Sequence, residues 1–261
     1  MNLLFIGDVV GKGGRLAVRG LVPELRKKYN CSFTIANVEN IAGGAGISAS
    51  CLTDFAGVVD VYTSGDHVWD QKGFEEEIKR LDNFLRPANY NKKQPGKGYD
   101  VFRNAGGGEI AVINLLGKVF MRESSSCPFE TVETILAAIP PTVKTIIVDI
   151  HAEATSEKAA MAHFLDGRVT AVVGTHTHVQ TADAVVLPKG TAFISDVGMT
   201  GSINSILGRD IDAVLKKFTS GMPHKLPVVE KDIRLDAVVI SYDMNTGRAS
   251  EIKNISVKAG F

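Results

Sequence analysis

The chain has 261 residues and is 44% hydrophobic, so it is long enough and apolar enough to bury a substantial core. Basic and acidic side chains both number 29, and the formal net charge is therefore zero at pH 7. This balance excludes a strong general nucleic-acid footprint, although it leaves room for a small nucleotide substrate in a local site.

The N-terminal residues MNLLFIGDVV are apolar, but Asp8 interrupts them and no basic segment precedes them. We therefore expect a first strand here, not a signal peptide. No apolar stretch approaches the roughly 20 residues of a membrane span, so we expect a soluble protein with no membrane partner. The three cysteines, an odd number without a CxxC pair, favour a reducing compartment, and the predicted location is cytoplasmic.

The first third of the chain alternates apolar runs, Gly-rich loops and amphipathic segments. The apolar runs predict strands at residues 3–6, 32–38 and 58–63. The amphipathic segments predict helices at residues 15–29, 48–56 and 74–81. Glycines cluster at residues 11–14 and 43–46, where no P-loop pattern occurs, and we interpret both clusters as tight turns. This order is typical of βαβ architecture.

The remaining elements predict a second sheet. A hairpin is expected from residues 99–102 and 109–116. It is followed by predicted helices at residues 129–139 and 156–164 and by buried strands at 144–150 and 171–174. The C-terminal part predicts short strands at 184–187 and 191–194, a loop at 196–201, a helix at 211–218, and a hairpin from 233–242 and 250–257. We predict one α/β domain, residues 1–261, with two packed sheets and helices outside.

Polar side chains follow five of the predicted strands. They are Asp8, Glu39, Asn40, Asp66, His67, His151, His176 and His178. Ligand sites in open α/β sheets lie at the carboxyl ends of the strands. Mixed carboxylate and imidazole ligands suit manganese, iron or zinc better than calcium or magnesium. Their number favours two ions about 3.5–4 Å apart that share a bridging carboxylate, as in phosphatases and nucleases.

Each of these side chains also has a purely structural alternative. Asp8 could cap the helix that follows it, Glu39 and Asn40 could be turn residues, and a histidine at a strand end is often only hydrogen-bonded locally. The structural alternative would need many independent coincidences, so we favour the metal site. His163 lies in a predicted helix and His224 in a Pro-flanked loop, and we assign neither to the site.

The motifs around these residues resemble the YmdB-like family, a bacterial branch of the calcineurin-like metallophosphoesterases, over essentially the whole chain. They are Gly7-Asp8-Val9-Val10-Gly11, Asn37-Val38-Glu39-Asn40, Gly65-Asp66-His67-Val68-Trp69-Asp70, the segments 149–158 and 173–183, and Asp196-Val197-Gly198-Met199-Thr200-Gly201. The resemblance implies a four-layer α/β/β/α sandwich and phosphodiesterase activity, including activity on cyclic nucleotides. It also implies a two-metal centre with iron, or alternatively manganese, and a homo-oligomer.

The resemblance also assigns roles to single residues. One set would hold the first metal: Asp8, Asn40 and His178. A second set would hold the other metal: Asp66, His151 and His176. Glu39 would bridge the two ions, and His67 would face the substrate phosphate and donate a proton to the leaving oxygen. Asp149 and Glu153 are candidates for orienting the histidine ligands.

Two positions depart from the family pattern. The family usually has asparagine where this chain has Asp66, and the extra negative charge is expected to change metal preference or rate without abolishing ligation. Residues 202–204, Ser-Ile-Asn, replace a run that more often resembles Pro-Tyr-Asp, so the substrate loop is expected to differ.

The functional hypothesis is hydrolysis of phosphodiesters, 2′,3′- or 3′,5′-cyclic nucleotides, by a hydroxide that bridges the two metals. His67 would be the catalytic acid. Two alternatives remain open at this point. One is a metal-binding regulatory protein with little turnover, and the other is a phosphomonoesterase or 5′-nucleotidase that uses the same centre.

Overall fold

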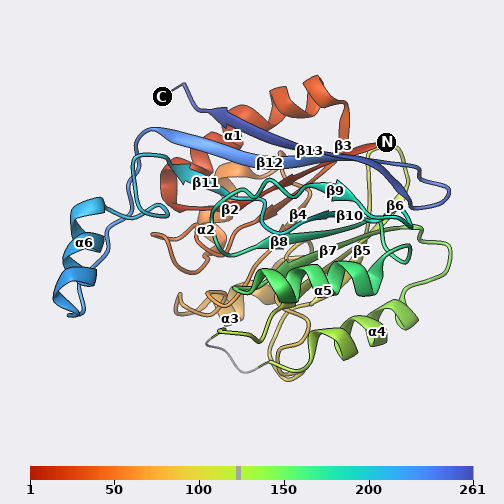
Figure 1. The fold of residues 1–261 in the computed structure, drawn as a ribbon, viewed down its shortest axis with the longest axis horizontal. Coiled ribbons are helices and arrows are strands. Elements are labelled where there is room, and N and C mark those ends of the chain that lie inside the picture. The colour runs from red at the N-terminus through yellow and green to blue at the C-terminus, as the bar shows by residue number, and fades with distance from the viewer. Residues whose placement is uncertain (122–124, 261) are drawn as a thin grey trace.

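Two β-sheets pack face to face in the computed structural model, which describes residues 1–121 and 125–260 (Figure 1). The first sheet contains β1 (Asn2–Ile6), β2 (Asp8–Val9), β3 (Cys31–Asn37), β4 (Val61–Thr63), β11 (Met199–Ser202), β12 (Ile233–Tyr242) and β13 (Ala249–Lys258). Its order is β2-β11-β12-β1-β3-β4, and β13 pairs with β12. The predicted C-terminal hairpin is therefore confirmed.

The second sheet has the order β5-β6-β7-β8-β10-β9. Its strands are β5 (Tyr99–Arg103), β6 (Glu109–Leu116), β7 (Thr145–His151), β8 (Ala171–Thr175), β9 (Val185–Val186) and β10 (Ala192–Ile194). The strands β5 and β6 form the predicted antiparallel hairpin, whereas β6, β7 and β8 run parallel. The prediction that this hairpin begins a second sheet is confirmed.

The helices lie outside the two packed sheets. They are α1 (Gly11–Tyr29), α2 (Ala49–Leu52), α3 (Phe74–Glu77), α4 (Pro128–Ala138), α5 (Thr155–Leu165) and α6 (Ile211–Ser220), with short 3₁₀ turns η1 (Thr53–Phe55) and η2 (Ile78–Arg80). Figure 1 shows α1 over the first sheet, α4 and α5 over the second, and α6 projecting from the body.

Successive side chains of β1 point to opposite faces of the first sheet, and this alternation explains how the layers pack. Leu4 and Ile6 pack in one core with Val18 and Val22 of α1, whereas Leu3 and Phe5 pack in another core with Ile147 and Val173 of the second sheet. A third core joins the second sheet to α4 and α5. The four-layer α/β/β/α sandwich is therefore confirmed.

The glycine-rich segment after β2 is not the turn that we predicted. The helix α1 begins at Gly11, four residues before the predicted start. It lies directly against β11, because a Cβ atom at Gly14 would come within 2.5 Å of the Thr200 carbonyl oxygen. The glycines therefore permit a close approach of helix and sheet.

The segment predicted as a loop at residues 196–201 is partly a strand. β11 pairs parallel with β2 through Met199 and Asp8, and antiparallel with β12 through Thr200 and Leu235. Its glycines suggested a loop, but its partners lie far away in the sequence, and tertiary pairing overrides the local preference.

The parallel strands bring the predicted site residues to one edge. β1, β3 and β4 run parallel in the first sheet, and β7 and β8 run parallel in the second. Their carboxyl ends meet where the two sheets pack. No helix in the described part of the chain has the length and hydropathy needed to cross a bilayer.

Candidate metal centre

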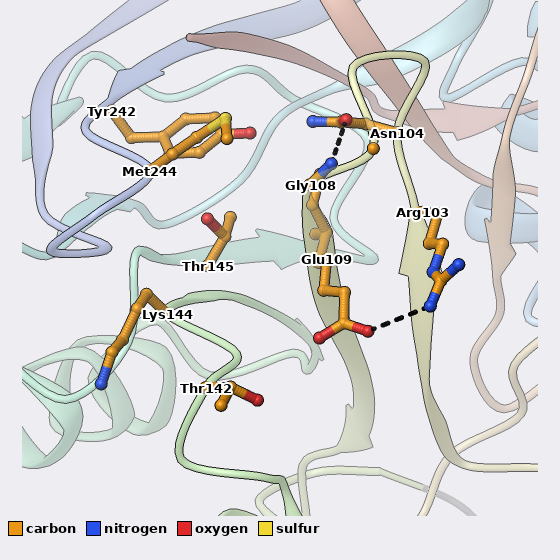
Figure 2. Close-up of a pocket in the computed structure, with 11 residues that line it drawn as sticks. Arg103, Asn104, Gly108, Glu109, Thr142, Lys144, Thr145, Tyr242 and Met244 are labelled. Atoms are coloured by element: carbon orange, nitrogen blue, oxygen red, sulfur yellow. Dashed lines mark hydrogen bonds and ion pairs between the residues drawn. The ribbon is translucent and has the colours of Figure 1, made fainter.

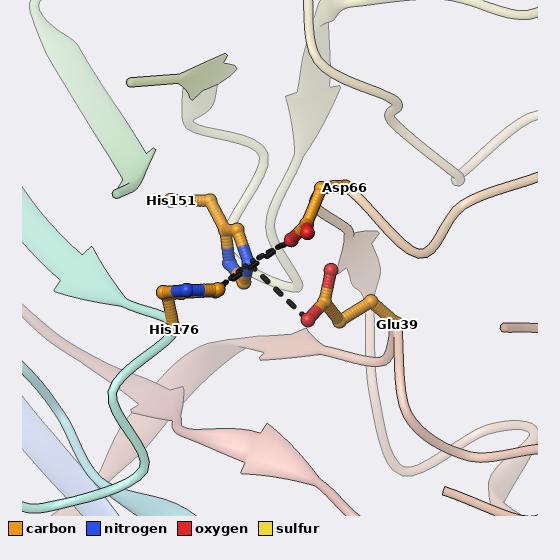
Figure 3. A group of neighbouring side chains, drawn as sticks. All are labelled: Glu39, Asp66, His151 and His176. Atoms are coloured by element: carbon orange, nitrogen blue, oxygen red, sulfur yellow. Dashed lines mark hydrogen bonds and ion pairs between the residues drawn. The ribbon is translucent and has the colours of Figure 1, made fainter. Parts of the chain in front are cut away.

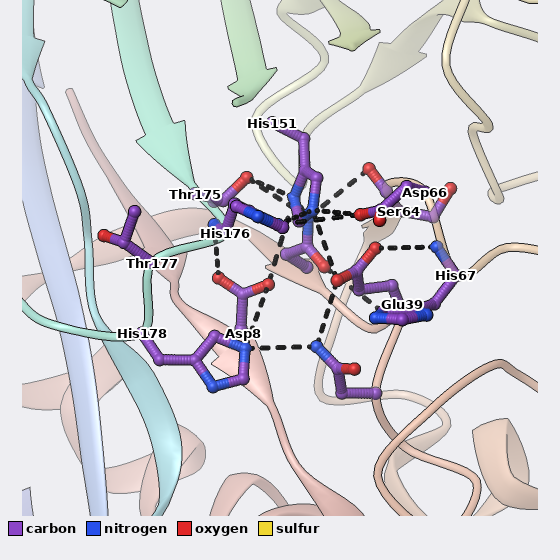
Figure 4. A network of polar contacts seen from close by, with 12 residues as sticks. Asp8, Glu39, Ser64, Asp66, His67, His151, Thr175, His176, Thr177 and His178 are labelled. Atoms are coloured by element: carbon purple, nitrogen blue, oxygen red, sulfur yellow. Dashed lines mark hydrogen bonds and ion pairs between the residues drawn. The ribbon is translucent and has the colours of Figure 1, made fainter. Parts of the chain in front are cut away.

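All eight residues predicted from the strand ends lie together at this edge, and Figure 4 labels all of them except Asn40. The residues that contact one another here are Asp8, Glu39, Asn40, Asp66, His67, His151, His176 and His178. Asp8 and Glu39 are fully buried, as is His151, whereas His67 and His176 are partly exposed. A buried polar cluster with an open side suits a site that receives a small ligand.

Four of these side chains form a compact group (Figure 3). One ligand atom from each of Glu39, Asp66, His151 and His176 lies within 4.8 Å of all the others. The Nε2 atom of His151 is 3.2 Å from Glu39 Oε1, 3.3 Å from Asp66 Oδ1 and 3.0 Å from His176 Nδ1. A ring nitrogen carries at most one proton and cannot serve three acceptors, whereas a metal ion among them would satisfy all four.

A second group adjoins the first. The Nδ2 atom of Asn40 lies 3.2 Å from His178 Nε2 and 3.1 Å from Glu39 Oε1. Asp8 Oδ1 lies 3.9 Å from His178 Nε2, is shielded from solvent, and has no hydrogen-bond donor in the described part of the chain. Buried carboxylate oxygens normally have a hydrogen-bond partner or a bound cation, so Asp8 Oδ1 is a candidate metal ligand. Glu39 contacts both groups.

Asp8 does not cap the helix after it. The N-cap of α1 is Val10, which makes no side-chain capping bond. The Oδ2 atom of Asp8 instead accepts the backbone N–H of His176 at 3.1 Å. The structural alternative for Asp8 is therefore wrong.

The charges of the centre depend on one another. Burial raises the pKa of Asp8 well above its usual value. Burial acts in the same direction on Glu39, but the neighbouring His151 lowers the pKa of Glu39 overall. Burial opposes protonation of His151, yet the carboxylates of Glu39 and Asp66 raise its pKa well above normal. Burial lowers the pKa of His178 to about 4, so its imidazole is neutral near pH 7.

His67 lies on the loop after β4 and is fixed by two contacts. Its backbone N–H donates to Glu39 Oε2 at 3.3 Å, and its Nδ1 lies 2.7 Å from Asp70 Oδ2. Sequence reasoning did not single out Asp70. Its position three residues after His67, in the same motif, was the available signal.

Comparisons with known proteins agree with this geometry. A family model described as YmdB-like protein matches residues 4–255. This chain belongs to the YmdB-like family. The resemblance drawn from the motifs is therefore confirmed.

Relatives of this family member match along nearly their whole lengths. The chain is 44% identical over 258 residues to the 2′,3′-cyclic-nucleotide 2′-phosphodiesterase of Bacillus subtilis (strain 168), covering 98% of this chain and 97% of that one. A hypothetical protein from Thermus thermophilus has a solved structure with a TM-score of 0.91, 36% identity and 99% coverage of both chains. A novel phosphatase from Mycoplasma pneumoniae has a TM-score of 0.92 and 32% identity, with 99% and 93% coverage.

In this YmdB-like protein a buried chain of hydrogen bonds orients His151. The hydroxyl of Thr175 donates to Asp149 Oδ1 at 2.7 Å, so its contact with His151 Nδ1 at 2.9 Å must have the imidazole as donor. When His151 is neutral, as a metal ligand must be, this leaves its lone pair on Nε2, which faces the cluster. Asp149 also accepts from Thr63 at 2.5 Å and from Asn37 at 3.2 Å.

The predicted supporting residues both lie near their histidines. Asp149 reaches His151 through Thr175, which sequence reasoning missed, and not by direct contact. Glu153 Oε2 lies 3.1 Å from His176 Nε2. Such outer contacts fix the orientation of histidine ligands.

Backbone geometry brings these side chains close. A Cβ atom at Gly65 would overlap the His151 ring, so only glycine fits before Asp66. His176 and His178 have φ values of 103° and 64°, a left-handed conformation that costs a non-glycine residue about 1–3 kcal/mol. The loop accepts this strain and points both imidazoles toward one centre.

A separate cavity of about 300 Å³ lies at the opposite edge of the sheets, beside the first residues of β7 (Figure 2). It is lined by Asn104, Lys144, Thr145 and Tyr242 among others, and its Arg103 pairs with Glu109 at 3.8 Å. None of the predicted site residues lines it. His163 and His224 also lie outside the metal cluster, and His224 contacts Ser220.

Proposed function

We propose that this protein is a two-metal-dependent phosphodiesterase that hydrolyses cyclic nucleotides. The convergence of carboxylate, amide and imidazole groups at one sheet edge carries the proposal. The name of the Bacillus subtilis relative supports 2′,3′-cyclic nucleotides as the first substrates to test, with 3′,5′-cyclic nucleotides as the second choice.

The two groups of side chains correspond to two ions. In our proposal Asp8, Asn40 and His178 hold the first ion, and Asp66, His151 and His176 hold the second. Glu39 would contribute to holding both ions, which agrees with its contacts to Asn40 and His151. Oxygen and nitrogen donors of this kind suit iron, which we expect first, or manganese.

When bound, the ions would supply Lewis acidity and lower the pKa of a water between them. His67 stands beside the bridging residue and donates a proton to the leaving oxygen. Asp70 holds the Nδ1 side of His67, so the Nε2 side remains the donor toward substrate. Thr175 and Glu153 keep His151 and His176 aimed at the centre.

Substrate comparison tests this function. The purified, manganese-loaded protein should hydrolyse bis-p-nitrophenyl phosphate faster than p-nitrophenyl phosphate, and it should open 2′,3′-cyclic AMP. The reverse preference would instead indicate a phosphomonoesterase. Bound metal without hydrolysis of any of these esters would indicate the regulatory alternative.

A further inference from the structure

A fully buried ion pair lies beneath the loop that carries His176 and His178. The Nζ atom of Lys158 is 2.9 Å from Asp196 Oδ2, and the side chains are 0% and 1% exposed. Lys158 comes from α5, and Asp196 follows β10. Every other lysine of the chain is exposed. Desolvation of two charges is unfavourable unless further hydrogen bonds offset it, so this pair requires an explanation.

Two of these further hydrogen bonds come from Thr177, in the loop that carries His176 and His178. Asp196 Oδ2 accepts the backbone N–H of Thr177 at 2.9 Å and the Thr177 hydroxyl at 2.8 Å. Asp196 Oδ1 accepts the N–H of Gly198 at 2.8 Å. Thr177 stands between the two histidines. One carboxylate therefore holds, by main chain and side chain, the residue that separates the two histidines of the centre.

This loop needs such an anchor. Both residues beside Thr177 have positive φ values, and neither is glycine. Strained conformations of this kind persist only where the surroundings determine them. The buried carboxylate of Asp8 lies close enough to Asp196 for their negative charges to repel each other. Without the ammonium of Lys158, the charge of Asp196 would be buried and unbalanced, and the carboxylate would no longer be directed at Thr177.

We propose that Lys158 is a positioning residue for the metal centre. Its ammonium neutralises Asp196 and fixes the direction of that carboxylate, which holds Thr177 and thereby aims His176 and His178. The inference rests on the proposed function only in treating these two histidines as ligands. Loss of Lys158 is expected to disturb both histidines while the sheets remain folded.

Lys158→Met tests the proposal, because methionine keeps an unbranched apolar stem and removes the charge. In the metal-free protein the imidazole NMR signals of His176 and His178 should shift or broaden, while those of His163 and His224 stay unchanged. Manganese affinity should fall about 10- to 100-fold, the usual effect of losing an outer contact of a ligand. Arg168→Met is the matched control, because it breaks the exposed Arg168–Glu133 pair and should change neither readout.

A charge-neutral double variant separates positioning from general stability. Lys158→Met with Asp196→Asn removes both charges and keeps an oxygen for Thr177, so it should recover part of the lost manganese affinity. If Lys158→Met does not fold, Thr177→Val is tested in its place. This variant removes only the hydrogen bond from the Thr177 hydroxyl to Asp196, and it should shift the NMR signals of the same two histidines.

Unchanged signals of His176 and His178, together with unchanged manganese affinity in folded Lys158→Met, would overturn the proposal. Unchanged signals in Thr177→Val would do so where Lys158→Met does not fold. A wild-type protein without phosphodiesterase activity would contradict the proposed function. The NMR signals of His176 and His178 in the metal-free protein would still show whether Lys158 positions these two histidines.

Discussion

The Nδ1 atom of His67 lies 2.7 Å from the Oδ2 atom of Asp70. The pair is partly exposed, unlike the buried carboxylates behind it, and the backbone of His67 is bound to Glu39. His67 is therefore held at the open side of the metal centre, with one ring nitrogen occupied and the other directed away from Asp70. This is the geometry expected of a proton donor that meets substrate.

Replacing His67 by alanine should lower kcat by about 10²–10⁴-fold, because the leaving oxygen loses its proton donor. Metal content should be unchanged, since His67 contacts Glu39 only through its backbone. Turnover of bis-p-nitrophenyl phosphate and metal analysis of the same sample measure the two effects. Loss of metal would show that His67 is a ligand.

Asp70→Asn should reduce kcat about 10-fold, less than the loss of His67 itself, because the ring keeps its place but loses its charged partner. Asp100→Asn is the control, since Asp100 forms a similar i,i+3 pair with Lys97 on the surface. Equal rates for Asp70→Asn and the control would show that the His67–Asp70 contact has no catalytic role.

Under the two-metal proposal, Glu39→Gln should release both ions together, because the Glu39 carboxylate contacts side chains of both groups. Glu133→Gln, which changes an exposed ion pair on α4, should keep both. Metal analysis after dialysis distinguishes the two variants. A Glu39→Gln protein that retains one ion at full stoichiometry would exclude the bridging role.

The sequence predicted much of this architecture because its patterns are local. Apolar runs followed by aspartate, glutamate or histidine predicted strands such as β3 and β7, and the polar residues after them became the candidate site residues. The segments β2 and β11 were not predicted as strands, because Asp8–Val9 and Met199–Ser202 are short, and their pairing partners are remote in the chain.

Local sequence patterns also fail to predict contacts between remote residues in the candidate metal centre. The candidate site residues follow strand ends in the sequence, whereas Thr175 contacts His151 and Asp149 only because β7 lies beside β8. Lys158 looked like any helical lysine. Its burial against Asp196 depends on how α5 packs on the second sheet, which no local pattern encodes.

Asp66→Asn tests the role of the negative charge at this position. An amide removes one negative charge next to His151, so the protein should retain metal less tightly and should bind an anionic diester with a lower KM. Metal competition with a chelator and steady-state kinetics measure the two effects. An unchanged KM together with unchanged metal retention would mean that the charge of Asp66 affects neither substrate binding nor metal binding.

Cys31 gives a pH dependence of stability that is independent of the metal centre. Burial raises the pKa of this thiol from 9.0 to about 11, against the opposing effect of Arg26. Above pH 9 the unfolded chain loses this proton first. The contribution of the protonated Cys31 thiol to the free energy of unfolding is therefore complete below pH 9. It is lost as the pH rises through about 11. Urea unfolding of wild type and Cys31→Ala should show their stability difference moving in favour of the variant at alkaline pH. A pH-independent difference would contradict this.

The central claim is most directly tested by titrating metal-free protein with manganese while bis-p-nitrophenyl phosphate hydrolysis is followed. We predict that activity rises until two ions are bound per chain and then stays constant. Two bound ions without hydrolysis, or full activity with a single ion, would contradict a two-metal phosphodiesterase.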